Sequence, residues 1–404
     1  MRRGEGVTVR NGYFVLDADT HQMELASMWA EFLAPEYRDR RPRVAEVDGM
    51  RLVTIEGEPL VARHRFPFPE PQVPQRATGL LTRVRVARFG AAARLADMDA
   101  HGVDVQVLFP TVAGQLLGRE FRDTGLLAAC CRAYNAWSCG YASAAPARLR
   151  WVATLPLQDV TLAVEEARRA ARDGAVGLYV RPNPILGRNL PDPAYEPLWA
   201  EIEALGLPVC LHDGSSPRLP SYGDRMTTHT SGHILSHPFE AMAAMMSLIW
   251  YGVVERHPDL RFIQLEADAG WLPYWLQRME QHYQLFGRAE HPDLLMSPTC
   301  YFRRNFYVAC RGDEPTLPSV VDLVGDDRLL FHSDYPHSDA TWPSGLDALE
   351  SQPIPADSRR RIFWENGARA FGLEPPQPAN EVITSNARPS TPARFVPTGP
   401  VTTS

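Results

Sequence analysis

Residues 149–181, LRWVATLPLQDVTLAVEEARRAARDGAVGLYVR, decide the fold. Two short apolar runs at 150–155 and 175–181 flank the segment 159–173, in which apolar residues recur at helical spacing. A strand, a helix and a second strand of these lengths predict one βαβ unit, whose two strands run parallel because a crossover helix joins them.

The same alternation continues from about residue 13 to residue 372. The further strand candidates are residues 13–19, 103–110, 207–212, 260–266, 305–310 and 328–333, and further helical patterns lie at 194–205, 240–256 and 273–285. Eight nearly continuous apolar strands, most of them separated by helices, predict a closed parallel barrel, an α/β fold of the (β/α)₈ TIM-barrel type. A doubly wound sheet is the alternative, but the turn after the first strand, Asp-Thr-His-Gln at 19–22, lacks the glycines of a dinucleotide site.

Three long segments and a tail complete the predicted organisation. We expect one barrel domain over residues 1–374, with a Pro/Arg-rich insertion at 22–89, and a disordered Pro/Ser/Thr-rich tail at 375–404. The insertion and the segments 213–236 and 286–303 are expected to follow strand ends at the catalytic face of the barrel. A lid over the site and simple decoration are both open interpretations of these segments.

Composition excludes several classes of function. The net charge is −7 and the 404 residues contain no long basic run, so nucleic-acid binding is disfavoured. All 41 basic residues are arginine; without lysine the chain cannot use a Schiff base, a phosphate-binding loop of the Walker type or a metal pair bridged by carboxylated lysine. The six cysteines form no CxxC pair, no apolar run is long enough to cross a membrane, and we expect no signal peptide. We therefore expect a soluble cytoplasmic protein with reduced thiols.

Residues that bind metals gather at the ends of predicted strands. The first strand ends in Asp19-Thr20-His21, the fifth in His212, and the eighth is followed by Asp334. In a parallel barrel the carboxyl ends of the strands meet at one face, where catalytic side chains project. Two imidazoles and two carboxylates are a suitable ligand set for one divalent cation, with a position left for water or substrate.

Three motifs add a family resemblance. DADTHQME at 17–24, PVCLHDG at 208–214 and FHSDYPH at 331–337 resemble the amidohydrolase-2 branch of the amidohydrolase superfamily, as does the segment 237–279. That branch includes aminocarboxymuconate-semialdehyde decarboxylase and the hydroxybenzoate decarboxylases. The resemblance covers roughly residues 13–372, and it implies one divalent metal ion, Zn²⁺ first and Mn²⁺ as the alternative. It assigns the ligands to the residues already singled out, Asp19, His21, His212 and Asp334.

The sequence departs from that family at the sixth strand. The decarboxylases carry a catalytic histidine there, where this chain has Glu266. Glu266 and His237 are the candidates to replace it, beside Asp334 as the residue that moves protons. His237 is expected to begin a helix, whereas the preceding histidines, His229 and His233, are interpreted as structural.

Two further residues are candidates for binding substrate. Arg181 ends the fourth strand and could pair with a substrate carboxylate, although a structural ion pair explains it equally well. His337 follows Asp334 by one turn and would face the same end of the barrel.

These residues predict an enzyme with a small-molecule substrate. A mononuclear metal-dependent hydrolase ranks first, in which a metal-activated water attacks a small carbonyl or carboxylate-bearing substrate and Asp334 is the general base. A metal-dependent non-oxidative decarboxylase ranks second, and a barrel scaffold without catalysis ranks third. A homodimer is implied by the resemblance alone.

Overall fold

The computed structural model describes residues 10–47, 49–61, 89–214 and 217–374. Eight parallel strands pair in the order β1-β5-β6-β7-β8-β9-β10-β11. Their bounds are β1 Leu16–Gln22, β5 Val105–Pro110, β6 Leu149–Thr154, β7 Gly177–Val180, β8 Val209–Leu211, β9 Phe262–Gln264, β10 Phe306–Cys310 and β11 Leu329–Phe331. The ring closes just after β11, where the His21 N–H donates to the Tyr335 carbonyl at 2.6 Å and the Asp334 N–H donates to the Asp19 carbonyl at 3.1 Å. The predicted (β/α)₈ barrel is confirmed.

The deciding βαβ unit forms as predicted. Helix α6, Val160–Arg172, joins β6 to β7, and the side chain of Asp159 caps its first turn by accepting the Leu162 N–H at 3.1 Å. A buried stripe of small residues, Ala163, Ala167 and Ala170, faces the barrel. Small side chains on this stripe allow the helix to lie close to the strands that it connects.

The first strand lies three residues later than the apolar pattern predicts. Residues 13–19 were expected, but β1 spans Leu16–Gln22 because a run of polar side chains, Asp17, Asp19, Thr20, His21 and Gln22, continues the strand into the barrel interior. Hydrogen bonds stabilise this polar end; the Thr20 hydroxyl, for example, donates to the Val107 carbonyl at 2.8 Å. Hydrophobic periodicity does not detect a buried strand of this composition.

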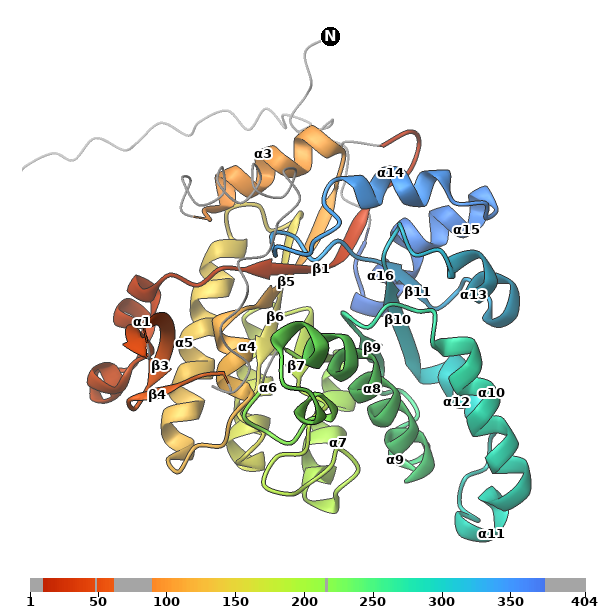
Figure 1. Cartoon of the computed structure of the whole chain (residues 1–404), viewed down its shortest axis with the longest axis horizontal. Helices are drawn as coiled ribbons and strands as arrows, with labels where there is room; N and C mark the ends of the chain where they lie inside the picture. The colour runs from red at the N-terminus through yellow and green to blue at the C-terminus, as the bar shows by residue number, and fades with distance from the viewer. Residues whose placement is uncertain (1–9, 48, 62–88, 215–216, 375–404) are drawn as a thin grey trace, which may run out of the picture.

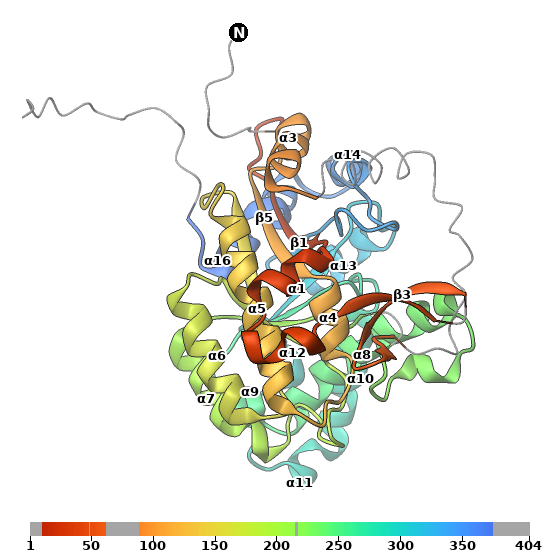
Figure 2. The same ribbon diagram turned by 90° about the vertical axis from the view of Figure 1, so that its left-hand side faces the viewer.

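Helices cover the outside of the barrel. Helices α5 (Thr124–Ala142), α6 and α7 (Glu196–Leu205) pack in sequence order against one another, as Figure 2 shows along one side of the molecule. The remaining cover consists of α3 Ala91–His101, α8 His229–Trp250, α9 Val253–Arg256, α10 Leu272–His282, α12 Pro298–Asn305, α13 Leu317–Val324, α14 Ser344–Ser351, α15 Ala356–Arg360 and α16 Asn366–Phe371. A short helix, α4 Val112–Leu117, follows β5 at the mouth of the barrel.

The insertion after β1 contains regular structure that its sequence did not reveal. It holds α1 (Ala26–Phe32), the 3₁₀ helix η1 (Pro35–Arg40) and a three-stranded antiparallel sheet, with strands β2 Arg43–Val47, β3 Met50–Ile55 and β4 Glu58–Pro59. Figure 1 shows this sheet beside α1, outside the ring of barrel strands. Residues 62–88 of the predicted insertion lie outside the described residues, as does the predicted tail at 375–404.

Two of the three long segments begin at the mouth of the barrel, and the prediction for the third was wrong. The segments at 22–89 and 213–236 follow the ends of β1 and β8. The segment 286–303 instead follows α10, contains α11 (Arg288–Glu290) and leads into β10, so it lies at the opposite end, where helices connect to strands (Figure 1).

The structure also describes the pairing state of the cysteines and the apolar character of the helices. All six cysteines are unpaired, and four of them, Cys130, Cys131, Cys210 and Cys310, are buried. Across the described ranges, no helix combines the length and apolar character that a membrane span requires.

Candidate metal centre

The structure brings together four predicted ligands from three barrel strands. Asp19 and His21 lie on β1, His212 follows β8 directly, and Asp334 lies three residues past β11. Ligand atoms of Asp19, His21 and His212 all lie within 4.8 Å of one another, and Asp334 Oδ1 is 3.3 Å from His21 Nε2. We call these four residues the strand-end cluster; none is more than 5% exposed.

Backbone carbonyls orient both imidazoles. His21 Nδ1 is 2.9 Å from the Pro110 carbonyl, and His212 Nδ1 contacts the carbonyl of Asp213. Since a carbonyl oxygen only accepts, each Nδ1 carries a proton, and Nε2 is the ring nitrogen that faces the cluster. The two Nε2 atoms face each other at 3.2 Å. In protein metal sites, a hydrogen bond from one ring nitrogen commonly fixes the orientation of a histidine whose other nitrogen binds the metal.

The spacing of the ligand atoms fits a single cation. His21 Nε2 is 3.5 Å from Asp19 Oδ1, and His212 Nε2 is 3.4 Å from Asp19 Oδ2. Two ligands that bind one cation at about 2.1 Å, with angles between octahedral and tetrahedral values, stand about 3.0–3.4 Å apart. The observed separations therefore match, or slightly exceed, those of a loaded site.

The Asp19 carboxylate has unused oxygens. Both of its oxygens are buried and accept no hydrogen bond. A buried acceptor without a partner costs about 1–3 kcal/mol, and a charged one costs more. A divalent cation between these oxygens and the two Nε2 atoms would supply the missing interaction, so the residues present fit the metal that the sequence predicts.

Asp334 is joined to His337, one turn further along. His337 Nδ1 is 2.9 Å from Asp334 Oδ1, and His337 Nε2 is 3.1 Å from the Thr111 hydroxyl. The His337 ring stacks on the His21 ring with centroids 4.0 Å apart. Burial raises the pKa of Asp334 to about 8 although His337 opposes the shift, and Asp334 raises the pKa of His337 to about 9 against the effect of burial. The two side chains form a pair that can share a proton at the edge of the cluster.

The histidine pKa values also reflect burial and neighbours. Burial, together with the nearby His337 and His212, holds the pKa of His21 well below its usual value. Burial also disfavours the charged form of His212, but the adjacent Asp19 carboxylate overcomes it and raises the pKa to about 10.

Asp17 fixes the eighth strand against the first. Its carboxylate accepts the Ser333 N–H at 2.9 Å and the Ser333 hydroxyl at 2.5 Å. Asp334, the next residue, has φ of +58°, a left-handed conformation that is strained for a residue with a side chain. The hydrogen bonds to Asp17 hold the backbone that places Asp334 at the cluster.

Arg181 lies behind the cluster. It is 1% exposed, and its guanidinium donates to the side chains of Asn183 and Asp213 and to the carbonyl of Gly214. Asp213 is the residue whose carbonyl oxygen orients His212. The described contacts pair Arg181 with Asp213, and its predicted contact with a substrate carboxylate stays a prediction.

The histidines after β8 lie on a longer helix than the sequence predicts. Helix α8 begins at His229 and is capped by Thr228, so His237 lies in its third turn rather than at its start. Pro238, at the next position, favours a helix boundary when read from the sequence alone. The extra turns place His233 beside His237, and both approach Glu266, which follows β9.

Several contributing residues carry no sequence signal of their own. Thr111 and Asp213 were missed, because their contacts with His337 and His212 are created only by the fold. Glu24 caps α4, accepting the N–H groups of Val112 at 2.9 Å and Ala113 at 3.0 Å.

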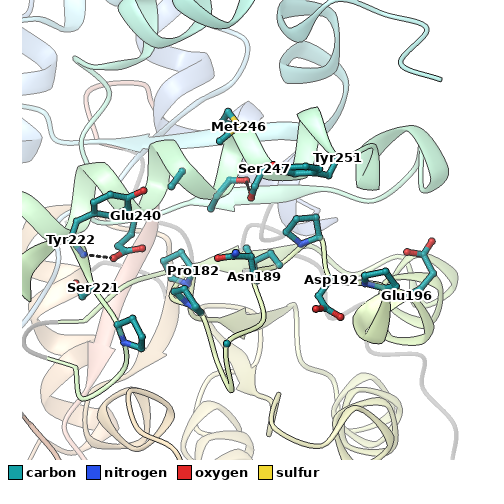
Figure 3. Close-up of a pocket in the computed structure, with 18 of the residues that line it drawn as sticks. Pro182, Asn189, Asp192, Glu196, Ser221, Tyr222, Glu240, Met246, Ser247 and Tyr251 are labelled. Atoms are coloured by element: carbon teal, nitrogen blue, oxygen red, sulfur yellow. Dashed lines mark hydrogen bonds between the residues drawn. The ribbon is translucent and has the colours of Figure 1, made fainter. Parts of the chain in front are cut away.

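A cavity of about 1040 Å³ lies beside this centre and not over it. It separates α8 from the loop after β7; Figure 3 shows Glu240, Met246 and Tyr251 along the helix, with Asn189 and Asp192 opposite. Its lining contains no member of the strand-end cluster. Burial raises the pKa of Glu240 in this cavity to about 7.

Fold and site together define a barrel with a buried candidate cation centre at the carboxyl ends of its strands. The chain belongs to the amidohydrolase family, whose model matches residues 18–373. It is 26% identical over 295 residues to the gamma-resorcylate decarboxylase of Polaromonas sp. (strain JS666 / ATCC BAA-500), across 69% of this chain and 86% of the relative. The resemblance found in the motifs is confirmed.

Two solved structures support the same fold. An amidohydrolase from Mycobacterium avium subsp. paratuberculosis K-10 aligns with a TM-score of 0.72 at 22% identity, over 89% of this chain and 99% of that one. The 5-carboxyvanillate decarboxylase of Novosphingobium aromaticivorans DSM 12444, in complex with manganese and 4-hydroxy-3-methoxy-5-nitrobenzoic acid, aligns with a TM-score of 0.64 at 19% identity, over 92% and 100%.

Proposed function

We propose that this protein is a metal-dependent non-oxidative decarboxylase of a hydroxylated aromatic carboxylate. The sequence ranks hydrolysis first, but the relatives favour the second-ranked reaction: gamma-resorcylate decarboxylase among the curated proteins and 5-carboxyvanillate decarboxylase among the structures. The observation in this chain that carries the proposal is the position of Asp334, which belongs to the strand-end cluster and is also paired with His337.

The strand-end cluster would hold one divalent cation through His21 Nε2, His212 Nε2 and the Asp19 and Asp334 carboxylates. Manganese in a related structure makes Mn²⁺ our first choice, ahead of the Zn²⁺ that the sequence favoured. When bound, the cation would fix the carboxylate and the neighbouring hydroxyl of the substrate and withdraw charge from them. The low exposure of the cluster excludes bulk water from the same place.

Asp334 would deliver the proton that replaces CO₂. The carboxyl proton passes from Asp334 to the ring carbon that bears the substrate carboxylate, forming a C–H bond. The C–C bond then breaks, CO₂ leaves, and the electron pair of that bond restores the aromatic ring. His337, at 2.9 Å, returns a proton to Asp334 for the next turnover. One proton is consumed and one CO₂ released, with no oxidant or reductant.

Arg181 is proposed as a positioning residue. Its guanidinium pairs with Asp213 instead of projecting into the mouth of the barrel, and Asp213 orients His212 through its carbonyl. His337 keeps its proposed contact with substrate, since it is partly exposed next to Asp334. A homodimer stays a prediction.

The test compares two reactions on one preparation. Manganese-loaded protein is incubated with ortho-hydroxybenzoates in D₂O, and CO₂ release and deuterium at the vacated ring carbon are measured. The same protein is incubated with aryl esters and lactones in ¹⁸O-labelled water. Release of CO₂ with one deuterium per product supports the proposal. Label from ¹⁸O-water in a hydrolysis product, without CO₂ release, would assign the hydrolase. If the protein binds no metal and catalyses neither reaction, the scaffold interpretation would remain.

A further inference from the structure

Next to the strand-end cluster lies a second group of metal-binding side chains. We propose that His233, His237, Glu266 and Asp339, here called the α8 cluster, bind a second divalent cation, with Glu266 as a carboxylate shared between the two. This goes beyond the proposed reaction, for which the strand-end cluster alone supplies a complete ligand set.

Helix α8 presents two imidazoles to one point. His233 and His237 are one turn apart on the same face of α8, with ring centroids 4.1 Å apart. His233 Nε2 is 3.4 Å from Glu266 Oε1, and His237 Nδ1 is 3.7 Å from Glu266 Oε2. Ligand atoms of these three residues all lie within 4.8 Å of one another. A pair of histidines spaced by four on a helix, with a carboxylate from another element, is a known way to bind zinc.

His237 gives independent support for a ligand at this point. Its side chain is 3% exposed, and neither ring nitrogen has a hydrogen-bond partner. A buried polar group left in this state costs about 1–3 kcal/mol. Its Nδ1 faces the Glu266 carboxylate at a distance too long for a hydrogen bond but suited to two ligands of one ion. A cation between them would satisfy both groups.

Carboxylates also gather at this point. Glu266, Asp334 and Asp339 place carboxylate oxygens within 4.8 Å of one another. Within the described ranges, every basic residue in a salt bridge with these three is a histidine. Carboxylates this close together repel each other unless a proton or a cation lies between them, so a divalent ion held by Glu266 and Asp339 would stabilise the arrangement.

Glu266 lies between the strand-end cluster and the α8 cluster, as a carboxylate that joins two cations would. Its Oε2 is 3.3 Å from His212 Nε2 of the strand-end cluster, while its Oε1 is directed to His233. Carboxylates join two-metal centres whose ions are about 3.5–4 Å apart. Glu266 also has φ of +51°, a strained conformation of the kind that gathers at functional sites. The sequence predicted a mononuclear centre because the chain lacks lysine, but a glutamate can join two ions without that modification.

The two sites should differ in affinity. Members of the strand-end cluster are at most 5% exposed, whereas the side chains of His233 and Asp339 are 27% and 56% exposed. Exposed ligands are less well fixed and compete with water, so the second ion should bind more weakly and exchange faster. An exchangeable ion with open positions could bind a second oxygen of an anionic substrate.

The test measures metal content directly. Protein stripped with a chelator is dialysed against increasing Mn²⁺, and bound metal is determined by elemental analysis. Wild type should bind two equivalents in a tight and a weaker step, whereas His233→Ala and His237→Ala should each keep the tight step and lose the weaker one. His282→Ala, which replaces a partly exposed histidine on α10, is the matched control and should bind two equivalents. In fully loaded wild type, the electron paramagnetic resonance spectrum should show two coupled Mn²⁺ ions.

Saturation of wild type at one equivalent, or retention of two by either cluster variant, would overturn the second site. If His237→Ala fails to fold, the partly exposed His233 decides the question. Because the readout is metal content, its outcome is separate from that of decarboxylation: two ions without CO₂ release would refute only the proposed reaction, and one ion with CO₂ release would refute only the second site.

Discussion

The strand-end cluster and the α8 cluster lie side by side but are built differently. The first takes its ligands from β1 and from the turns after β8 and β11, whose backbones are hydrogen bonded around the barrel. The second depends on one face of α8 and on Glu266, and two of its members are partly exposed. Rigid strand ends fix the ligand geometry before metal binds, whereas partly exposed ligands such as His233 and Asp339 are less firmly held. The predictions below test this difference from the largest effect to the smallest.

Loss of His212 should have the largest effect. His212→Ala removes an Nε2 ligand that is already aimed by the Asp213 carbonyl, so the tight Mn²⁺ step should disappear and turnover should fall to background. Elemental analysis and CO₂ release measure the two effects on one sample. The weaker metal step should survive, because the α8 cluster keeps its own ligands. A variant that retains the tight step would show that the ligand assignment is wrong.

Asp334→Asn should separate catalysis from metal binding. Asparagine keeps an oxygen for coordination but cannot carry the proton, and general acid groups contribute roughly 10²–10⁴-fold in rate. We expect kcat to fall by about that factor while metal content stays near wild type. Asp19→Asn is the matched comparison: it should weaken metal binding and rate together, because Asp19 lies 3.5 Å and 3.4 Å from the two imidazoles. Near wild-type turnover in Asp334→Asn would transfer the proton role to another residue.

The same contrast explains what the sequence could predict. The strand-end cluster was found from sequence because each ligand follows a recognisable apolar strand, and parallel strands end at one face. The α8 cluster was not found, because Pro238 obscured the helical turns that bring His233 beside His237. Glu266 was located correctly at the sixth strand, but its contacts with both clusters depend on distances that no local pattern encodes.

Polar residues and insertions limited the rest of the prediction. Seven strands begin and end within two residues of their predicted bounds, whereas β1 is shifted by three because its buried end is polar. The small sheet of β2, β3 and β4 lacks a strong apolar alternation and was not predicted within the insertion. In both regions hydrogen bonds contribute to a structure that apolar periodicity alone does not predict.

Arg181→Met should destabilise the part of the fold that supports the strand-end cluster. The change leaves Asp213 as a buried, unpaired carboxylate, and breaking a buried ion pair in this way costs about 3–5 kcal/mol. Urea unfolding of metal-free protein should show a loss of that size, and the tight Mn²⁺ step should weaken because Asp213 no longer fixes His212. The double variant with Asp213→Leu should recover much of the stability, since it removes the unpaired charge. A loss below about 1 kcal/mol would contradict the positioning role.

Glu240→Gln should give the smallest effect, and it probes α8 beyond its metal ligands. Burial in the cavity between α8 and the β7 loop raises the pKa of Glu240 from 4.5 to about 7, while the Tyr222 N–H donates to its Oε1 at 2.9 Å (Figure 3). The folded protein therefore binds this proton more tightly than the unfolded chain does. The resulting stability is fully present below pH 4.5 and is lost as pH rises through 7. From pH 4.5 to 8, wild type should lose between about 1 and 3 kcal/mol that Glu240→Gln retains, measured by urea unfolding at each pH. The difference between the two proteins should be the same with and without Mn²⁺, because Glu240 belongs to neither cluster; a difference that disappears on metal loading would place Glu240 in the metal centre.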